Sequence, residues 1–149
     1  MQAKQYLKKA KRIDSFIRAK EEELEMLRLK ASSVGSMNLS ADKIQSSPNQ
    51  TKLQDDVIAI LECEDKIKKA IQDLRKLHSE ITEKIDEIDN DDFRLILILR
   101  YLNLKEWEFI AVEMNFSYSH TLFLHKQALD AFQTKHKDFL ENTKLHRKS

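Results

Sequence analysis

The middle of the chain carries an unbroken heptad repeat. One series of positions falls seven residues apart at Leu53, Ile60, Ile67, Leu74, Ile81 and Ile88, and a second lies between them at Val57, Glu64, Ile71, His78 and Ile85. Alternating steps of three and four residues are typical of a coiled-coil seam. Residues 53–88 are therefore predicted to form one long helix whose stripe faces another helix.

A second long helix is predicted ahead of it. The same spacing recurs at Ala3, Tyr6, Ala10, Ile13, Ile17, Lys20, Leu24, Leu27 and Ala31, which predicts a helix from about Ala3 to Ala31. Residues 32–46 lose this period and contain the only glycine, Gly35, so a loop over about 32–47 is expected. Ser47 as N-cap, Pro48 at N1 and Gln50 at N3 form a start signal for the next helix.

The two stripes fit each other as an antiparallel hairpin. When Lys20 is placed opposite Glu64, the other layers follow with a constant sum of residue numbers, and Ile17 meets Ile67. Glu64 and His78 interrupt the stripe as polar residues of a wet seam, with pH sensing as an alternative role for His78. In this register Cys63 lies on the side opposite the seam.

The apolar stripe is wider than a two-helix seam. Further apolar residues flank it at Leu7, Phe16, Leu61, Ala70 and Leu77. An isolated hairpin would leave these side chains exposed. Dimerisation into a four-helix bundle covers them, as does packing on the C-terminal part of the chain, and dimerisation is the favoured interpretation.

The C-terminal part predicts a small helical module. Residues 89–92 end the heptads, and Asn90 can cap the next helix. Residues 93–102 are apolar on most sides; their β-branched content alone would allow a strand, but the cap, the length and the helical neighbours favour a buried helix. Residues 106–114 predict a short helix with Trp107, Ile110, Ala111 and Met114 on one face.

A tight turn and a longer helix come next. Asn115 stands where a turn needs a positive φ angle, and Ser117 can cap a helix that continues through Phe132. The inward face of this helix is predicted to hold Thr121, Leu124, His125, Ala128 and Phe132. A short helix, a turn and a longer capped helix form the helix-turn-helix pattern.

The residues of this module also carry a family resemblance. They are Arg100, Tyr101-Leu102, Trp107-x-x-Ile110-Ala111, Met114-x-Phe116-Ser117 and Leu124-His125-x-x-Ala128-Leu129-x-x-Phe132. This order resembles region four of bacterial sigma factors. More closely, it is similar to phage and prophage regulators of the ArpU and RinA type, and to a related phage family of unassigned function. That family carries a motif similar to Ile44-Gln45-Ser46-Ser47-x-Asn49-Gln50 ahead of the long helix. The resemblance implies a DNA-binding regulator of phage genes.

The sequence departs from the family pattern at several places. The family usually has glycine before the second helix and in the central turn, where this chain has Leu104 and Asn115. It usually has threonine capping the tryptophan helix, where this chain has Glu106. Arginines are common on the exposed face of the recognition helix, where this chain has Ser119 and Phe123.

The candidate DNA-reading face lies on the helix after Ser117. The residues expected to face the groove are Tyr118, Ser119, His120, Leu122, Phe123 and Lys126. Only Lys126 among them is a fixed cation. Leu122 and Phe123 suit thymine methyl groups, or equally an apolar contact with a protein partner.

The charge of the module is nearly balanced. Between Phe93 and His136 five basic residues (94, 100, 105, 126 and 135) stand against four acids (106, 108, 113 and 130). Such a monomeric module should bind DNA weakly. Dimerisation would double the contacts, and two basic runs would add phosphate contacts, namely Lys4, Lys8, Lys9, Lys11 and Arg12, and Lys144, Arg147 and Lys148 beside His146. The alternative for both runs is a solvated surface.

Composition narrows the remaining possibilities. One Gly, one Pro and 34% charged residues predict an all-α protein, and the net charge of +1 gives no global attraction to nucleic acid. A lone cysteine, Cys63, and the absence of a long apolar run predict an intracellular protein without membrane contact. The resemblance to phage regulators implies the cytoplasm of a bacterial host.

The sequence shows no pattern typical of an active site. His120 and His125 share no helical face, and one glycine cannot build a phosphate loop. No enzyme activity, metal or cofactor is expected.

These patterns predict three regions. Residues 1–90 form an antiparallel hairpin that mediates dimerisation, residues 91–136 form a three-helix module similar to sigma region four, and residues 137–149 form a basic tail. The expected function is that of a phage-type transcriptional regulator that binds DNA as a homodimer. The alternative is a protein-interaction module whose helix-turn-helix docks on a protein such as RNA polymerase.

Overall fold

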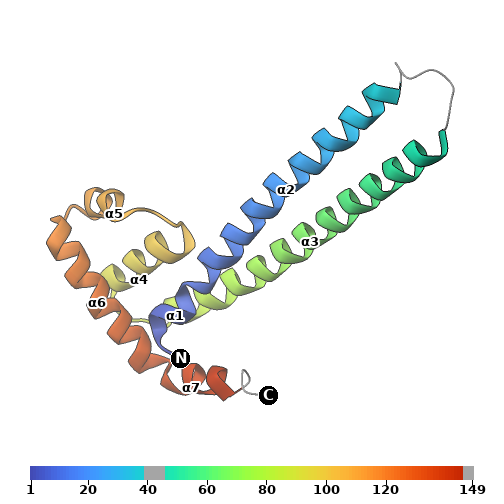
Figure 1. Cartoon of the computed structure of the whole chain (residues 1–149). Coiled ribbons are helices and arrows are strands. Elements are labelled where there is room, and N and C mark those ends of the chain that lie inside the picture. The colour runs from blue at the N-terminus through green and yellow to red at the C-terminus, as the bar shows by residue number, and fades with distance from the viewer. Residues whose placement is uncertain (39–45, 146–149) are drawn as a thin grey trace. The chain divides into compact units, whose positions relative to one another are not determined.

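The computed structural model describes residues 1–38 and 46–145, with side chains for residues 1–33 and 50–143. The elements are α1 (Ala3–Leu7), α2 (Lys9–Asn38), α3 (Ser46–Asp86), α4 (Asp91–Leu97), the π-helical turn η1 (Ile98–Leu102), α5 (Trp107–Met114), α6 (Tyr118–Lys135) and α7 (Lys137–Leu145) (Figure 1). The described residues contain no strand, which confirms the all-α prediction and the helical assignment of residues 93–102. None of these helices is long and apolar enough to cross a membrane.

The chain divides into two compact units. Residues 14–73 form one, called here the hairpin unit, and residues 1–13 together with 74–149 form the other, called here the terminal unit. The long helices α2 and α3 contribute to both. Because the terminal unit combines the two ends of the sequence, the first residues of the chain pack with the C-terminal helices.

In the hairpin unit α2 and α3 run side by side in opposite directions (Figure 1). The buried apolar residues are Ile17 and Leu24 on α2 and Cys63, Ile67 and Ala70 on α3. The Cys63 thiol donates to the carbonyl oxygen of Lys20 at 3.4 Å, so Lys20 lies one residue away from its predicted partner, Glu64. The antiparallel direction is therefore confirmed. The predicted Lys20–Glu64 pair is not formed, because Glu64 pairs with Arg28 at 3.0 Å and Lys20 with Glu23 at 2.7 Å.

The seam of α3 differs from the prediction along one edge. Val57, expected in a core layer, is 45% exposed, whereas Cys63, expected on the opposite side, is only 4% exposed. The helix is turned so that Cys63 and Ala70 face α2 in place of the neighbouring positions. This rotation buries the small apolar residues Cys63 and Ala70 and leaves Glu64 half-exposed, where it pairs with Arg28 at 3.0 Å. It also buries Asp56 on the same stripe, and Lys30 lies 3.7 Å from that carboxylate.

Helix boundaries also differ from the prediction. The first helix is broken at Lys8 and continues to Asn38, well beyond Ala31, so the predicted loop begins later than expected. A glycine inside a helix costs only about 1 kcal/mol, which explains why Gly35 does not end it. At the next helix α3 begins at Ser46, which places Ser47 inside the first turn. Residues 44 and 45 of the motif over 44–50 lie outside the described residues, and so do the side chains of residues 46–49, which include the caps expected there.

The terminal unit is built around a continuous apolar core. Its buried members are Met1, Ala3, Tyr6, Leu7, Ala10, Ile81, Ile85, Ile88, Ile96, Leu97, Leu99, Tyr101, Ile110, Met114, Leu124, Ala128, Phe132 and Leu140. The predicted cap of α4 is confirmed, since the Asn90 side chain accepts a hydrogen bond from the Phe93 amide at 3.0 Å. Every helix of this unit contributes to the core.

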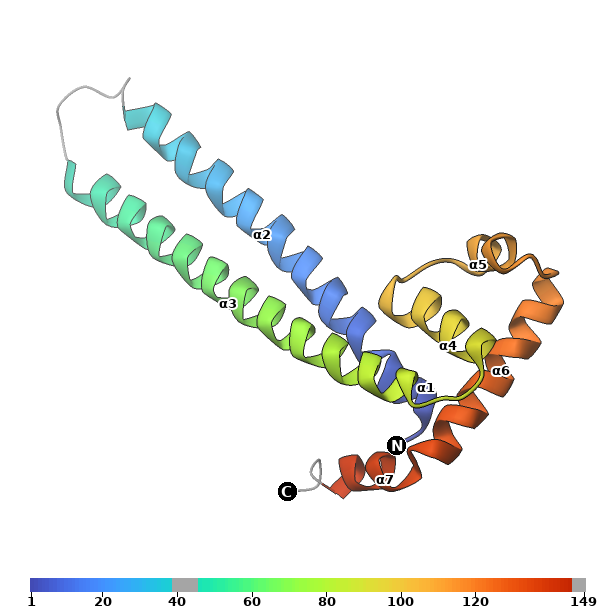
Figure 2. The same cartoon turned by 180° about the vertical axis from the view of Figure 1, so that it is seen from behind.

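The start of the chain packs on α6 and α7 (Figure 2). The Met1 amino group donates to the Leu140 carbonyl at 3.0 Å. The Tyr6 ring stacks on Phe132 with a centroid distance of 6.0 Å, and its hydroxyl donates to the Glu80 carboxylate. The sequence predicts only a basic tail for residues 137–149, but Lys137–Leu145 form α7 and bury Leu140, because an apolar residue on this segment completes the core.

Candidate DNA-reading face and a basic pocket

A tight turn joins α5 to α6, as predicted. Asn115 adopts the left-handed conformation with φ 59° and ψ 42°, and its amide bonds to the Val112 carbonyl at 3.1 Å. Ser117 then caps α6, its hydroxyl oxygen accepting from the His120 amide at 3.1 Å. These contacts set the direction in which α6 leaves α5.

The inward face of α6 is the one predicted. Thr121, Leu124, His125, Ala128 and Phe132 are all buried, and Thr121, Ala128 and Phe132 have no exposed surface. The Thr121 hydroxyl donates to the Ser117 carbonyl at 2.8 Å, which satisfies this buried polar group inside the helix. The helix is thereby held on the core of the terminal unit along its length.

The six candidate residues lie on the exposed face of the same helix. They are Tyr118, Ser119, His120, Leu122, Phe123 and Lys126, and all are exposed. The largest apolar members are Phe123, 56% exposed, Tyr118, 48% exposed, and Leu122, 37% exposed. The His120 ring packs edge-on against Phe116 with centroids 4.6 Å apart, which restricts its rotation. The structure brings these side chains to one surface, and contact with DNA remains a prediction.

The neighbouring helix α5 adds two exposed apolar residues that are not among the candidates from the sequence. Phe109 is 46% exposed and Val112 is 82% exposed. Both are apolar positions of 106–114 that fall outside the inward set of Trp107, Ile110, Ala111 and Met114. Their position outside the predicted buried face could have identified them from the sequence, because apolar residues off the buried face of an amphipathic helix mark a second surface.

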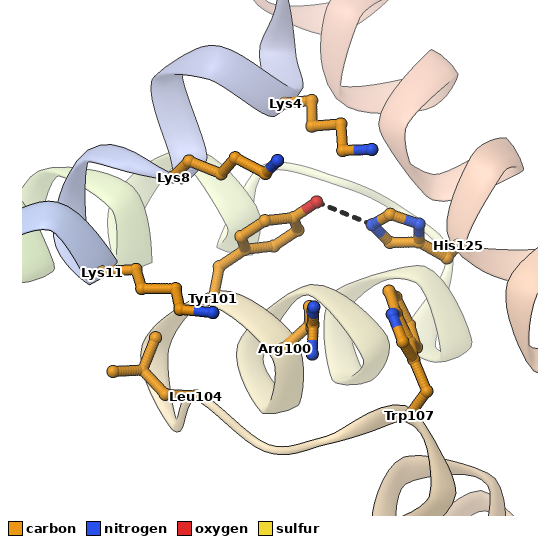
Figure 3. A pocket seen from close by; sticks show the side chains of 8 residues that line it. All are labelled: Lys4, Lys8, Lys11, Arg100, Tyr101, Leu104, Trp107 and His125. Carbon is orange, nitrogen blue, oxygen red and sulfur yellow. Dashed lines mark hydrogen bonds between the residues drawn. The ribbon is translucent and has the colours of Figure 1, made fainter.

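A basic pocket opens on another part of the terminal unit (Figure 3). The cavity has a volume of about 160 Å³ and is lined by Lys4, Lys8, Lys11, Arg100, Tyr101, Leu104, Trp107 and His125. The sequence indicates the three lysines only as part of a basic run. Their spacing of four and three residues places them on one helical face, and this spacing could have indicated a basic surface from the sequence alone.

Two uncharged aromatic side chains form part of the pocket wall. The Tyr101 hydroxyl and His125 Nε2 share a hydrogen bond of 2.7 Å, and the Trp107 ring meets the His125 ring edge-on at 4.5 Å. Burial, followed by the nearby charges of Lys4, Arg100 and Lys8, lowers the pKa of His125 to about 4. Burial raises the pKa of Tyr101 to about 12, with Arg100 acting in the opposite direction. Both groups are therefore neutral near pH 7.

The backbone is irregular where it lines this pocket. Arg100 and Tyr101 lie in η1, where the Asn103 amide bonds to the Ile98 carbonyl at 2.9 Å in the π-helical pattern. Leu104 follows with φ 55°. The Arg100 guanidinium lies over the Trp107 ring at 4.5 Å, and its Nη1 donates to the Lys105 carbonyl at 3.0 Å. Arg100 is thus held in place at the rim.

Leu104 and Asn115 have a further property in common. They are the non-glycine residues with positive φ in the described part of the chain. The resemblance described above places glycine at both positions. A positive φ angle has a conformational cost that is larger for leucine than for asparagine.

Metal-binding chemistry finds no obvious place in the described residues, which hold no group of three or more His, Cys, Asp or Glu side chains able to share an ion. Comparison with curated proteins gave no match, and comparison with solved structures gave none. One family model, described as a protein of unknown function (DUF1492), matches residues 33–133. This match runs from the second half of α2 to α6 and covers more than half of the 149 residues, so the chain belongs to the DUF1492 family.

Proposed function

We propose that this protein is a phage-type transcriptional regulator that binds DNA through a helix-turn-helix formed by α5, residues 115–117 and α6. The observation that carries the proposal is the division of α6 into two faces. One face is seated on the core through residues such as Leu124 and Ala128. The other leaves the six candidate residues exposed, namely Tyr118, Ser119, His120, Leu122, Phe123 and Lys126. A firmly held helix with a free N-terminal half is what major-groove reading requires.

The exposed side chains suit several contacts with a duplex. Ser119, His120 and Lys126 can form hydrogen bonds to base edges or phosphates, and Leu122 and Phe123 suit thymine methyl groups. In helix-turn-helix proteins the first helix crosses the backbone while the second enters the groove. In this protein those roles fall to α5 and α6, and the function needs neither catalysis nor a cofactor.

Charge supplied by the start of the chain supports DNA binding. The module from Phe93 to His136 is nearly neutral, but the terminal unit also contains residues 1–13, with their basic run from Lys4 to Arg12. The packing of Met1 and Tyr6 on α6 and α7 holds this run in the same compact unit. Added lysines raise non-specific affinity because each neutralised phosphate releases counterions.

Homodimerisation through the hairpin unit forms part of the proposal. Apolar side chains remain exposed on both of its helices, at Phe16, Met26, Leu29, Val57, Ile58 and Leu61. Apolar surface of this extent on a helical hairpin is typical of a face that another copy covers. Two copies would present two reading helices to a site with matching half-sites.

A second function has its own supporting observation. The exposed apolar residues of α5 and α6 include Phe109, Val112 and Phe123, and apolar groups on a free surface often mark a protein partner. Under this alternative the same surface docks on a component of the transcription machinery such as RNA polymerase. The low basic content of α6 favours it, and the basic run at the chain start favours DNA.

A gel-shift titration with matched charge variants separates the two functions. Lys126→Glu places an acid on the reading face, and Lys135→Glu makes the same charge change at the end of α6. DNA binding should fall strongly in the first variant and much less in the second, because only Lys126 lies among the candidate residues. Equal losses in both variants would contradict a specific role for this face. Unchanged DNA binding after Lys126→Glu would remove α6 as the reader.

A further inference from the structure

Four cations converge on the basic pocket with no acid in its wall. Lys4, Lys8 and Lys11 approach from the start of the chain, and Arg100 approaches from η1 (Figure 3). Within the described part of the chain none of the three lysines forms an ion pair. The acid nearest to Arg100 is Glu106, at 3.9 Å and with a largely exposed side chain.

Such an arrangement favours an anion. Like charges around one cavity repel each other, and a bound anion removes that repulsion. The cations also surround neutral hydrogen-bonding groups, the Tyr101 hydroxyl and the His125 imidazole, which share a 2.7 Å bond. A pocket with charged groups at its rim and a hydroxyl in its wall offers both charge and hydrogen bonds to an oxyanion.

Independent irregularities of the fold meet at the same place. The π-helical turn η1 carries Arg100 and Tyr101, and Leu104 adopts a positive φ angle. The third feature is the buried His125, which lies near the charges of Lys4, Lys8 and Arg100, so that its protonated form is disfavoured. Costly local structure of this kind concentrates at functional sites, where the surrounding fold maintains it for a purpose.

We propose that this pocket binds a phosphate group, held by Lys4, Lys8 and Arg100 with the Tyr101 hydroxyl as a further hydrogen-bonding partner. Its volume of about 160 Å³ is similar to that of engineered cavities of roughly 150 Å³ that hold a benzene molecule. A phosphate group fits within that space, so the rest of a larger ligand would remain outside. Three cations around one group match the charge of a phosphate better than that of a carboxylate.

The pocket contains none of the six candidate reading residues, and phosphate binding in it does not require DNA binding. Its lysines nevertheless belong to the basic run that the proposed function assigns to DNA. The phosphate can belong to a small soluble ligand or to the backbone of a duplex. The Lys11 side chain completes the basic rim in either case. The two sources are distinguished by testing free anions and DNA on the same variants.

The first arm is a calorimetric titration of the full chain with inorganic phosphate and pyrophosphate, at ionic strength held constant with chloride. The test variant is the double change Lys4→Gln and Lys8→Gln. The control is Arg75→Gln and Lys76→Gln, which removes the same charge from exposed positions of α3 in the same unit. The proposal expects saturable binding by the wild type and the control, weakened roughly tenfold or more in the test variant. Circular dichroism checks that each variant remains helical.

The second arm is a gel shift of the same three proteins on a duplex at low salt. A loss confined to the titration identifies a soluble phosphate ligand, and a loss confined to the gel shift, beyond that of the control, identifies a backbone phosphate. Equal behaviour of test and control variants in both arms would overturn the proposal. If none of the three proteins binds DNA, the function proposed above fails and the titration alone tests the pocket. In that case the phosphate proposal is contradicted if the wild type does not bind phosphate, or if the test variant binds it as tightly as the control.

Discussion

The hairpin unit and the terminal unit bury their apolar residues in different ways. In the hairpin unit, two helices share a narrow seam, and large side chains such as Met26 and Leu61 remain more than half exposed. In the terminal unit, helices from both ends of the chain enclose side chains such as Phe132 and Ile96 completely. Two helices packed side by side cover each other along only one stripe, whereas several crossing helices can enclose a core. We therefore expect the terminal unit to be the more stable of the two, and the exposed apolar residues of the hairpin unit are the basis of the proposed homodimer.

Among the substitutions that test this comparison, Phe132→Ala should cause the largest loss of stability. The ring is fully buried and stacks on Tyr6, so its removal leaves a cavity in the terminal core. The free energy of unfolding should fall by roughly 3–5 kcal/mol, measured by urea denaturation. Leu24→Ala in the hairpin seam should cost less, because fewer atoms surround that side chain. A smaller loss for Phe132→Ala than for Leu24→Ala would reverse the comparison.

Leu61→Glu should weaken self-association of the hairpin unit. An unpaired charge in an apolar interface is costly, so the dimer dissociation constant should rise by roughly a hundredfold. Sedimentation velocity over a concentration series measures the change. Val112→Glu serves as the control, since Val112 is even more exposed but belongs to the terminal unit. A monomeric wild type, or an equal effect of both substitutions, would show that the exposed hairpin residues are not a dimer interface.

The terminal unit should lose stability in acid through His125. Its pKa is lowered from 6.5 to about 4 in the folded chain, so the unfolded chain binds a proton first as the pH falls. Stability from the neutral imidazole is therefore complete above about pH 6.5 and is lost between 6.5 and 4. After allowance for solvent screening in the pocket, we expect a loss of roughly 2 kcal/mol. Unfolding measured across this range for wild type and His125→Gln isolates the effect, and parallel curves would refute it.

The smallest expected changes in stability come from substitutions at the two residues with positive φ, Leu104 and Asn115. Leu104→Gly should raise the free energy of unfolding by about 1 kcal/mol, because leucine at positive φ is strained. Asn115→Gly should change it by only a few tenths, because asparagine tolerates this conformation. Thermal unfolding of both variants measures the difference. A destabilised Leu104→Gly protein would mean that the leucine side chain contributes more by packing at the pocket than its backbone costs.

Local signals in the sequence predicted much of the C-terminal fold. Asn90, Asn115 and Ser117 act at the positions expected of them, because caps and turns depend on neighbouring residues. The buried face of α6 followed from helical spacing for the same reason. All six candidate reading residues proved to be exposed, but exposure alone does not show what they bind.

The hydrophobic periodicity of the sequence could not predict contacts between residues far apart in the chain. The contact of Tyr6 with Phe132 joins residues far apart in the sequence, and no local pattern specifies it. The basic pocket was missed for that reason, since Lys4 and Arg100 come together only when the chain start packs on the C-terminal helices. On α3, two adjacent stripes are apolar enough to form a seam, and the structure buries the stripe with Cys63 and Ala70 although it also contains Asp56.

The most direct test of the proposed function is the salt dependence of DNA binding by the full chain on a duplex from upstream of its own gene neighbourhood. We predict saturable, sequence-selective binding by a dimer that weakens as salt rises, with a logarithmic slope of roughly −0.9 for each phosphate contacted. Absence of binding at low salt by a folded dimer would contradict the regulator assignment. The exposed apolar residues Leu122 and Phe123 would then become the surface to test against a protein partner.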